Sequence, residues 1–312
     1  MKDAAQEANY KGESYKLKDY MLLIKPSLSI MVVFSSVICY LLAPNVVEYN
    51  WVMILLLFIG GMLVTGSANA INQTVEKDTD AMMKRTSNRP VAAGRMSVNE
   101  GWTFAILTGL AGVLILGYFF NWKSAGLAAF SLFLYAFIYT PLKKVNAISV
   151  FVGAFPGALP CLIGWVAGTY LIMPFEEMTV DNKVYNNAGG WVLFGLQFLW
   201  QFPHFWAIAW VAHSDYAKAG FKLLPSEKGP TKFTALQTII YSLLLIPVGI
   251  LPYVIGMSGM TSLVIVTIMN IFLVMQCVRL YYENDKKAAR RVMFSSYLHL
   301  PVVLLALLSD KL

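Results

Sequence analysis

Long hydrophobic runs alternate with short polar connections along most of the chain. About nine runs can be distinguished, at 21–43, 50–71, 101–120, 124–141, 147–171, 190–212, 233–255, 260–281 and 292–309. Each is close to the roughly 20 apolar residues that an α-helix needs to cross a bilayer. The pattern predicts an all-α membrane protein with about nine transmembrane helices. It also predicts a single transmembrane domain, 21–312, after a polar N-terminal segment, 1–20.

The composition excludes an ordinary soluble domain. Of the 312 residues, 58% are hydrophobic and only 13% are charged, and the mean hydropathy is +0.61, values typical of multi-pass membrane proteins. The polar start of the chain does not predict a cleavable signal peptide. Cys39, Cys161 and Cys277 lie within hydrophobic runs and lack metal-ligand spacing. We therefore expect them to be buried apolar side chains.

Positive charge is divided unevenly between the two sides of the predicted membrane domain. If successive connections alternate in side, all 24 lysines and arginines except Lys123, Lys183 and Lys311 fall on one side. Because cytoplasmic loops carry the excess of such residues, we expect a cytoplasmic N-terminus and an odd number of spans. The same asymmetry accounts for the net charge of +7 without a nucleic-acid partner. The expected surroundings are the lipid bilayer, in the inner membrane of a cell or of a mitochondrion.

A dense group of charges, 72–95, directly follows the second hydrophobic run. Asn72, Glu76 and Asp80 are four residues apart, so on a continuing helix they share one face, whereas Asp78 points elsewhere. Three oxygen-bearing side chains that leave coordination positions for water and phosphate are typical of a Mg²⁺ site. The cations Lys84, Arg85 and Arg89 follow, and are suited to stabilise a departing diphosphate. The alternative reading is an ordinary cytoplasmic loop whose acids balance its bases.

A second polar loop, 213–232, follows the sixth run, four helices after the first. The two loops suggest an internal repeat that faces a shared cavity. Asp215 is the acid nearest the membrane, and Lys218 follows it. His204 precedes Asp215 by eleven residues, about 16 Å along a helix, so both are expected on one face. An imidazole within a span is uncommon, although a lone histidine also occurs as a packing residue. Lys143, in a third connection, is a further candidate phosphate contact.

Two stretches together resemble the UbiA-type intramembrane prenyltransferases. They are NQTVEKDTDAMMKRTSNRPVAAGR, at 72–95, and WQFPHFWAIAWVAHSDYAKAGFKLLPSEKG, at 200–229. The run KRTSNRP marks the broad family, and PHF followed by DYAKAG and LP resembles its haem-modifying branch. The resemblance covers nearly the whole chain, from LIKPS to the ninth run. It implies a helical bundle around a central cavity.

The chain departs from the family pattern at two positions. The family's first motif is Asn-x3-Asp-x3-Asp, but the middle acid here is Glu76, whose longer side chain requires an adjusted metal geometry. The second motif is Asp-x3-Asp, but Asp215 is followed four residues later by Ala219. The resemblance implies metal ligands at Asn72, Glu76, Asp80 and Asp215. The loss of one acid leaves open whether one or two Mg²⁺ ions bind.

The resemblance also implies a reaction. Farnesyl diphosphate is joined to a vinyl group of haem b, water adds in the same step, and haem O and diphosphate are formed. Mg²⁺ is the implied cofactor, with haem b as substrate. Lys84, Arg85, Arg89, Lys143 and Lys218 are the implied diphosphate contacts, and His204 the implied haem contact. The implied protein partners are a haem A synthase or terminal oxidase assembly factors.

Three other functions are compatible with parts of the pattern. A UbiA-type enzyme with an aromatic or quinone-precursor acceptor would share the diphosphate site but would not need His204. An ion-coupled transporter would place acids near the middle of its spans, whereas here the carboxylates gather at one membrane boundary. A haem carrier without catalysis would not need the Asn72–Asp80 motif.

Overall fold

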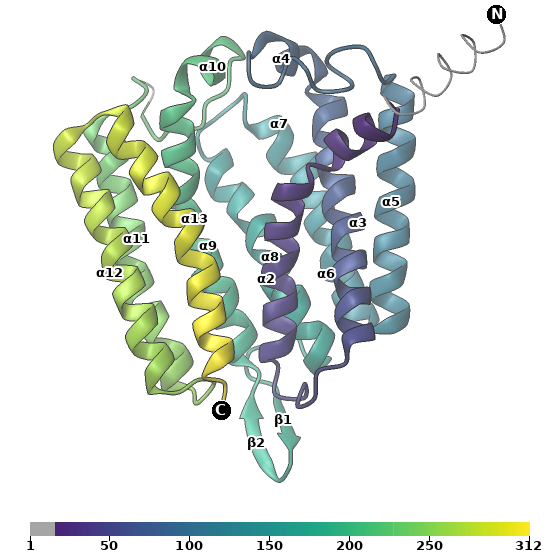
Figure 1. Cartoon of the computed structure of the whole chain (residues 1–312), viewed down its shortest axis with the longest axis vertical. Helices are drawn as coiled ribbons and strands as arrows, with labels where there is room; N and C mark the ends of the chain where they lie inside the picture. The colour runs from purple at the N-terminus through teal and green to yellow at the C-terminus, as the bar shows by residue number, and fades with distance from the viewer. Residues whose placement is uncertain (1–15, 227) are drawn as a thin grey trace, which may run out of the picture.

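The computed structural model describes residues 16–226 and 228–312, so most of the predicted segment 1–20 lies outside the described residues. A first helix, Lys16–Ile24, precedes the labelled elements of Figure 1. The helices are α2 (Pro26–Leu42), α3 (Trp51–Val75), α4 (Lys77–Met82), α5 (Val98–Phe119), α6 (Trp122–Phe133), the π-helix η1 (Leu134–Tyr139), α7 (Thr140–Leu142), α8 (Ser149–Thr169), α9 (Ala188–Val211), α10 (His213–Lys218), α11 (Lys232–Val254), α12 (Met260–Glu283) and α13 (Lys286–Ser309). The prediction of an all-α membrane protein is confirmed.

Seven helical segments of the described residues are long and apolar enough to span a membrane, and one of them, Trp122–Leu142, comprises α6, η1 and α7. Lys16–Ile24 and α2 together form an eighth candidate, bent by 44°. The helix α9 has 24 residues and covers 190–211 of the expected run 190–212. It is not among the seven candidate membrane spans found in the described residues. Its interior carries Gln197, Gln201 and His204, which lower its hydropathy. The count of nine spans therefore stays a prediction.

The predicted first span, 21–43, is broken at Lys25. This residue precedes a proline, which disfavours the helical conformation, and it adopts φ 49° and ψ 70°. The carbonyl groups freed by the break find partners on α3. Gln73 Nε2 donates to the carbonyls of Leu22 and Leu23, at 3.1 and 2.7 Å, and Asn69 Nδ2 donates to that of Ile24 at 3.1 Å. The break is therefore a hydrogen-bonded part of the structure.

The long helices stand roughly side by side, with α2 next to α8 and α3 next to α5 (Figure 1). Small residues allow the close approaches, as expected for helices packed in a bilayer. A Cβ on Gly164 of α8, for example, would collide with the backbone of Ser36 on α2. Cys39, Cys161 and Cys277 are all fully buried and free, in agreement with the sequence prediction.

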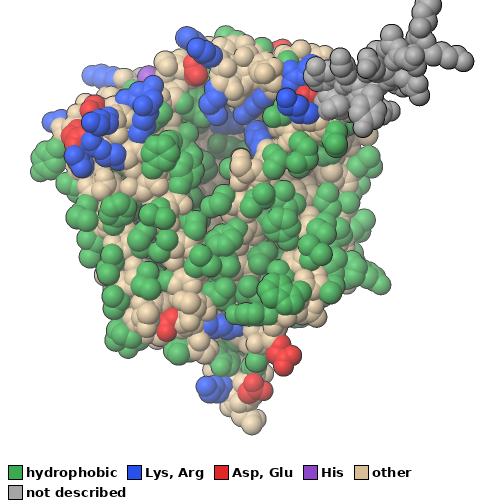
Figure 2. All heavy atoms as spheres, viewed as in Figure 1, with side chains coloured by type: hydrophobic (Ala, Val, Ile, Leu, Met, Phe, Trp, Pro, Cys, Tyr) green, Lys and Arg blue, Asp and Glu red, His purple; other side chains and the backbone are tan. Residues whose placement is uncertain are grey.

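The two ends of the bundle differ in charge. Figure 2 shows lysines and arginines gathered at the end that carries α4 and α10, above a broad hydrophobic belt. At the opposite end, the antiparallel strands β1 (Glu177–Val180) and β2 (Lys183–Asn186) form a projecting hairpin (Figure 1). The hairpin is the solvated segment expected between the fifth and sixth hydrophobic runs.

Candidate active site

A cavity of about 720 Å³ lies inside the bundle. Its walls come from α2, α3, η1, α8, α9 and α13, and its charged lining comes from Lys25, Glu76, Asp80, Arg85, Arg89 and Lys143. At the end of the molecule where cations gather, the surface is hollowed between them (Figure 2). The cavity thus joins a charged region to an apolar interior.

The first sequence motif forms one wall of the charged region. The helix α3 ends at Val75 and α4 begins at Lys77, but hydrogen bonds continue through the junction. Glu76 N donates to the carbonyl of Asn72 at 2.9 Å, and Asp80 N donates to that of Glu76 at 2.7 Å. The four-residue spacing therefore keeps all three side chains buried on the cavity, whereas Asp78 is exposed, as the spacing predicted.

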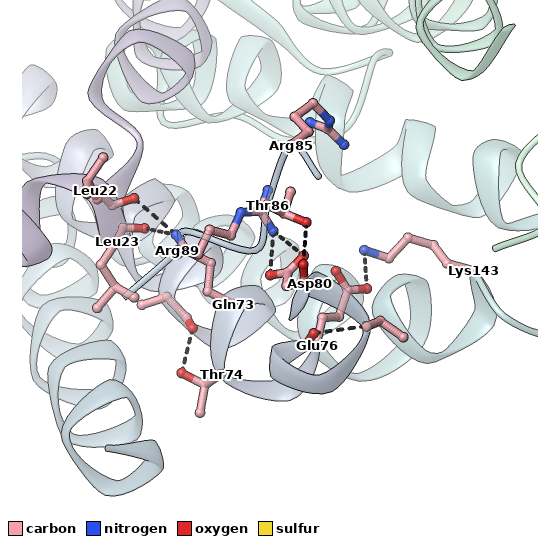
Figure 3. Close-up of polar contacts among 12 residues, drawn as sticks. Leu22, Leu23, Gln73, Thr74, Glu76, Asp80, Arg85, Thr86, Arg89 and Lys143 are labelled. Carbon is pink, nitrogen blue, oxygen red and sulfur yellow. Dashed lines mark hydrogen bonds and ion pairs between the residues drawn. The ribbon is translucent and has the colours of Figure 1, made fainter. Parts of the chain in front are cut away.

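Each carboxylate of this motif has its own cation (Figure 3). Lys143 Nζ lies 2.5 Å from Glu76 Oε1. Arg89 Nη1 donates to both oxygens of Asp80, at 2.7 and 2.6 Å. Burial raises the pKa of Asp80, although Arg89 opposes the shift. Burial lowers the pKa of Lys143, and the neighbouring Glu76 carboxylate opposes this shift.

The two polar loops meet over the cavity, as their spacing in the sequence predicted. Arg85 Nη2 donates to the hydroxyl of Tyr216 at 3.0 Å. Met83 packs in one apolar cluster with Ala219 and Phe221, and Lys222 N donates to the carbonyl of Lys143 at 2.8 Å. The second loop therefore helps to position both Arg85 and Lys143.

Three predicted site residues lie elsewhere. Lys84 and Lys218 are exposed, Asp215 is half-buried, and none of them is among the described residues that line the cavity. His204 lines the cavity, whereas Asp215, on the short helix α10 that follows the end of α9 at Val211, does not. The position of the missing second acid, Ala219, is packed in an apolar cluster.

Sequence reasoning missed Lys25 and two tyrosines. Lys25 lines the cavity because the break after Ile24 turns it inward. The signal was the pair Lys-Pro inside the first hydrophobic run. Tyr135 and Tyr139 also line the cavity and come from η1, a π-helix of the kind often found at functional sites. A Cβ on Gly153 would lie 2.6 Å from the ring of Tyr139, so a glycine is needed there.

The deeper region of the cavity contains His204. Its imidazole stacks on the indole of Trp200, with centroids 4.5 Å apart, and its Nδ1 lies 2.8 Å from Ser296 Oγ. Tyr297 packs against the edge of the same ring, at 5.0 Å. All four residues belong to α9 and α13, and His204, Trp200 and Tyr297 line the cavity. The imidazole and the charged region therefore face one space.

The residues of the charged region fit a hydrated magnesium ion. Asn72, Glu76 and Asp80 supply hard oxygen atoms, which Mg²⁺ prefers. The buried Nδ2 atom of Asn72 has no partner among the described residues. Those residues also contain no cluster of three acids, histidines or cysteines arranged as metal ligands. Asn72, Glu76 and Asp80 would leave the remaining coordination positions of such an ion to water and a phosphate group.

Known proteins share both the sequence and the fold. Residues 32–298 match the UbiA prenyltransferase family. The chain is 44% identical to a protoheme IX farnesyltransferase of Cytophaga hutchinsonii, covering 94% of this chain and 97% of the relative. It is 43% identical to a protein of the same name from Flavobacterium johnsoniae, covering 94% of each.

Among solved structures, a digeranylgeranylglyceryl phosphate synthase matches with a TM-score of 0.75 at 22% identity, covering 95% of this chain and 98% of that one. A UbiA homolog from Archaeoglobus fulgidus bound to GPP and Mg²⁺ matches with a TM-score of 0.62 at 14% identity, covering 93% and 99%. These two matches show a common fold. The family model and the relatives at 44% and 43% identity establish that this chain belongs to the UbiA prenyltransferase family.

Proposed function

We propose that this prenyltransferase transfers a farnesyl group from farnesyl diphosphate to a vinyl group of haem b, with addition of water, and forms haem O and diphosphate. The observation that carries the proposal is that one cavity is lined by a cluster of cations and carboxylates and also by His204. The names of the relatives, protoheme IX farnesyltransferase, support the same acceptor.

The charged region is suited to bind the diphosphate. Asn72, Glu76 and Asp80 would hold Mg²⁺, which when bound neutralises charge on the phosphate oxygens. Arg85 and Arg89 lie around the same space, as does Lys143. Because they are already ordered in a largely apolar cavity, they stabilise the leaving group more strongly than water would. We include Lys25 among the diphosphate contacts.

The reaction is balanced in the following way. The bond between C1 of the farnesyl chain and the diphosphate oxygen breaks, and its electron pair leaves with diphosphate. The terminal vinyl carbon bonds to C1, which leaves a cation on the inner vinyl carbon. The oxygen of water bonds to that carbon and releases one proton. The rings of Tyr135 and Tyr139 line the cavity and provide electron-rich faces for an allylic cation.

Around His204 the cavity is lined by the aromatic side chains of Trp200, Phe205 and Tyr297, which suit a flat porphyrin. His204 is the proposed haem contact, because imidazole is the commonest nitrogen ligand of haem iron in proteins. An enzyme with an aromatic or quinone-precursor acceptor would use the same diphosphate end. Such an acceptor would not explain the buried imidazole of His204 that stacks on Trp200.

The direct test is incubation of the purified protein with haem b and farnesyl diphosphate, with and without Mg²⁺. We expect a Mg²⁺-dependent product heavier than haem b by one farnesyl group plus water. Asp80→Ala should abolish the product while haem still binds, which separates diphosphate chemistry from acceptor binding. Prenylation of a phenolic acid in place of haem would contradict the proposed acceptor.

A further inference from the structure

The hydroxyl of Ser296 determines which nitrogen of His204 carries hydrogen. Ser296 Oγ lies 2.7 Å from the carbonyl oxygen of Met293, one turn earlier on α13. A carbonyl only accepts hydrogen bonds, and two oxygens this close would repel each other without a hydrogen between them. The single hydroxyl hydrogen of Ser296 is therefore directed to Met293.

Ser296 Oγ consequently offers only lone pairs to the imidazole. It lies 2.8 Å from Nδ1 of His204, so Nδ1 must donate the hydrogen in this contact. A neutral imidazole carries one ring hydrogen, and the other nitrogen is then an acceptor. His204 is thus held with a free lone pair on Nε2.

The orientation of the ring is fixed by the same serine. Trp200 stacks on His204 with an interplanar angle of 18°. Its Nε1 donates to the carbonyl oxygen of Ser296 at 3.0 Å. Ser296 therefore holds the imidazole of His204 by its edge, and it also holds the indole of Trp200 against the face of that imidazole. A flip of the ring would break the Nδ1 hydrogen bond.

We infer that Ser296 is a positioning residue that presents the Nε2 lone pair of His204 to the iron of a bound metal–tetrapyrrole. This inference rests on the proposed function for the identity of the acceptor. An Nδ1–H that donates to an acceptor fixes the tautomer of a metal-ligating histidine and raises its basicity. Ser296 on α13 supplies the acceptor of that hydrogen bond, and His204, the proposed iron ligand, is on α9.

The test uses the full-length protein loaded with haem b, reduced to the ferrous state. The iron–histidine stretching band in its resonance Raman spectrum reports on the hydrogen bond made by Nδ1. Ser296→Ala removes the acceptor, and Ser296→Cys replaces it with a weaker one of similar size. We expect the band to shift in both variants, and haem to bind about 10- to 100-fold more weakly in Ser296→Ala.

Ser295→Ala is the matched control, because Ser295 is the adjacent serine of α13 and is not among the described residues that line the cavity. Its band should stay at the wild-type position. An unchanged band in both Ser296 variants would overturn the inference, and so would a band that persists in His204→Ala. If wild-type protein shows no such band but still farnesylates haem, this inference fails and the proposed function stands. If no farnesylated haem forms at all, the proposed function fails.

Discussion

At the scale of single residues, the charged region is organised as two internal ion pairs. The longer side chain of Glu76, where the family pattern has aspartate, reaches Lys143 beyond η1. Asp80 is held by Arg89, whose Nη1 contacts both carboxylate oxygens. Buried pairs of this kind contribute little net stability, but removal of one partner leaves an uncompensated charge. In the proposed reaction, binding of a magnesium diphosphate would therefore exchange these partners rather than fill an empty set of ligands.

Removal of the Lys143 charge should damage both stability and turnover. We expect Lys143→Met to lower the free energy of unfolding by about 3–5 kcal/mol, because Glu76 is left buried and charged. Turnover should fall about 100- to 1,000-fold through loss of a leaving-group contact. Thermal melting in detergent and product formation measure the two effects. The double variant with Glu76→Gln should recover stability but not turnover; recovery of both would contradict a role in catalysis.

The same burial predicts a narrow dependence of activity on pH. The pKa of Asp80 is raised and that of Lys143 is lowered, in both cases by burial. If turnover needs both charged forms, kcat/KM falls earlier than usual on the acid side, as Asp80 gains a proton. It also falls earlier on the alkaline side, as Lys143 loses one. Lys143→Arg should move the alkaline limb upward, since arginine stays charged. An alkaline limb that does not move would show that another group causes it.

At the scale of secondary-structure elements, the break between Lys16–Ile24 and α2 is the feature that most affects the site. Gln73 of α3 satisfies two of the freed carbonyl groups, and Lys25 then lines the cavity next to Glu76 and Asp80. A backbone discontinuity at membrane depth is tolerated only where its polar groups find partners. The hydrogen bonds of α3 therefore set the position of a cation on another element.

Two variants separate the structural role of the Gln73 hydrogen bonds from the role of the Lys25 charge. Gln73→Leu should lower the melting temperature, because the buried carbonyl of Leu23 and the part-buried carbonyl of Leu22 lose their partner, at a cost of about 1–3 kcal/mol. It should also raise KM for farnesyl diphosphate, as Lys25 moves. Lys25→Met should raise KM without a comparable loss of stability. Equal KM values for Lys25→Met and wild type would show that this lysine does not contact the substrate.

Much of this organisation was predictable from the chain, and the reasons for the rest are physical. Hydrophobic run lengths predicted the helices, and the spacing of Asn72, Glu76 and Asp80 predicted a common face because helix geometry is local. The inward position of Lys25 depends on hydrogen bonds from Asn69 and Gln73 to the carbonyls that precede it. Both donors belong to α3, which is far from Lys25 in the sequence. Asp215 does not line the cavity, and no local signal in the sequence announced the end of α9 before it. The pairing of Glu76 with Lys143 is a tertiary contact that spacing alone does not encode.

At the scale of the whole molecule, the asymmetry of charge makes a prediction about orientation. In a variant without its native cysteines, one new cysteine is placed at Ser87, near α4, or at Asp181, in the hairpin turn; both positions are exposed. Because cations gather at the α4 end, we expect Ser87→Cys to react with a membrane-impermeant reagent only from the cytoplasmic side. Asp181→Cys should react only from the opposite side. The reverse pattern would show that the protein is inserted the other way round.

The two ion pairs have a consequence for the order in which ligands arrive. The cavity lining holds four formal cations, Lys25, Arg85, Arg89 and Lys143, against two carboxylates. A bare divalent cation meets net electrostatic repulsion there, whereas an anionic chelate is attracted. Magnesium should therefore enter already complexed to the prenyl diphosphate, in a compulsory sequence. Calorimetric titration should detect tight uptake of the chelate and negligible uptake of the free ion.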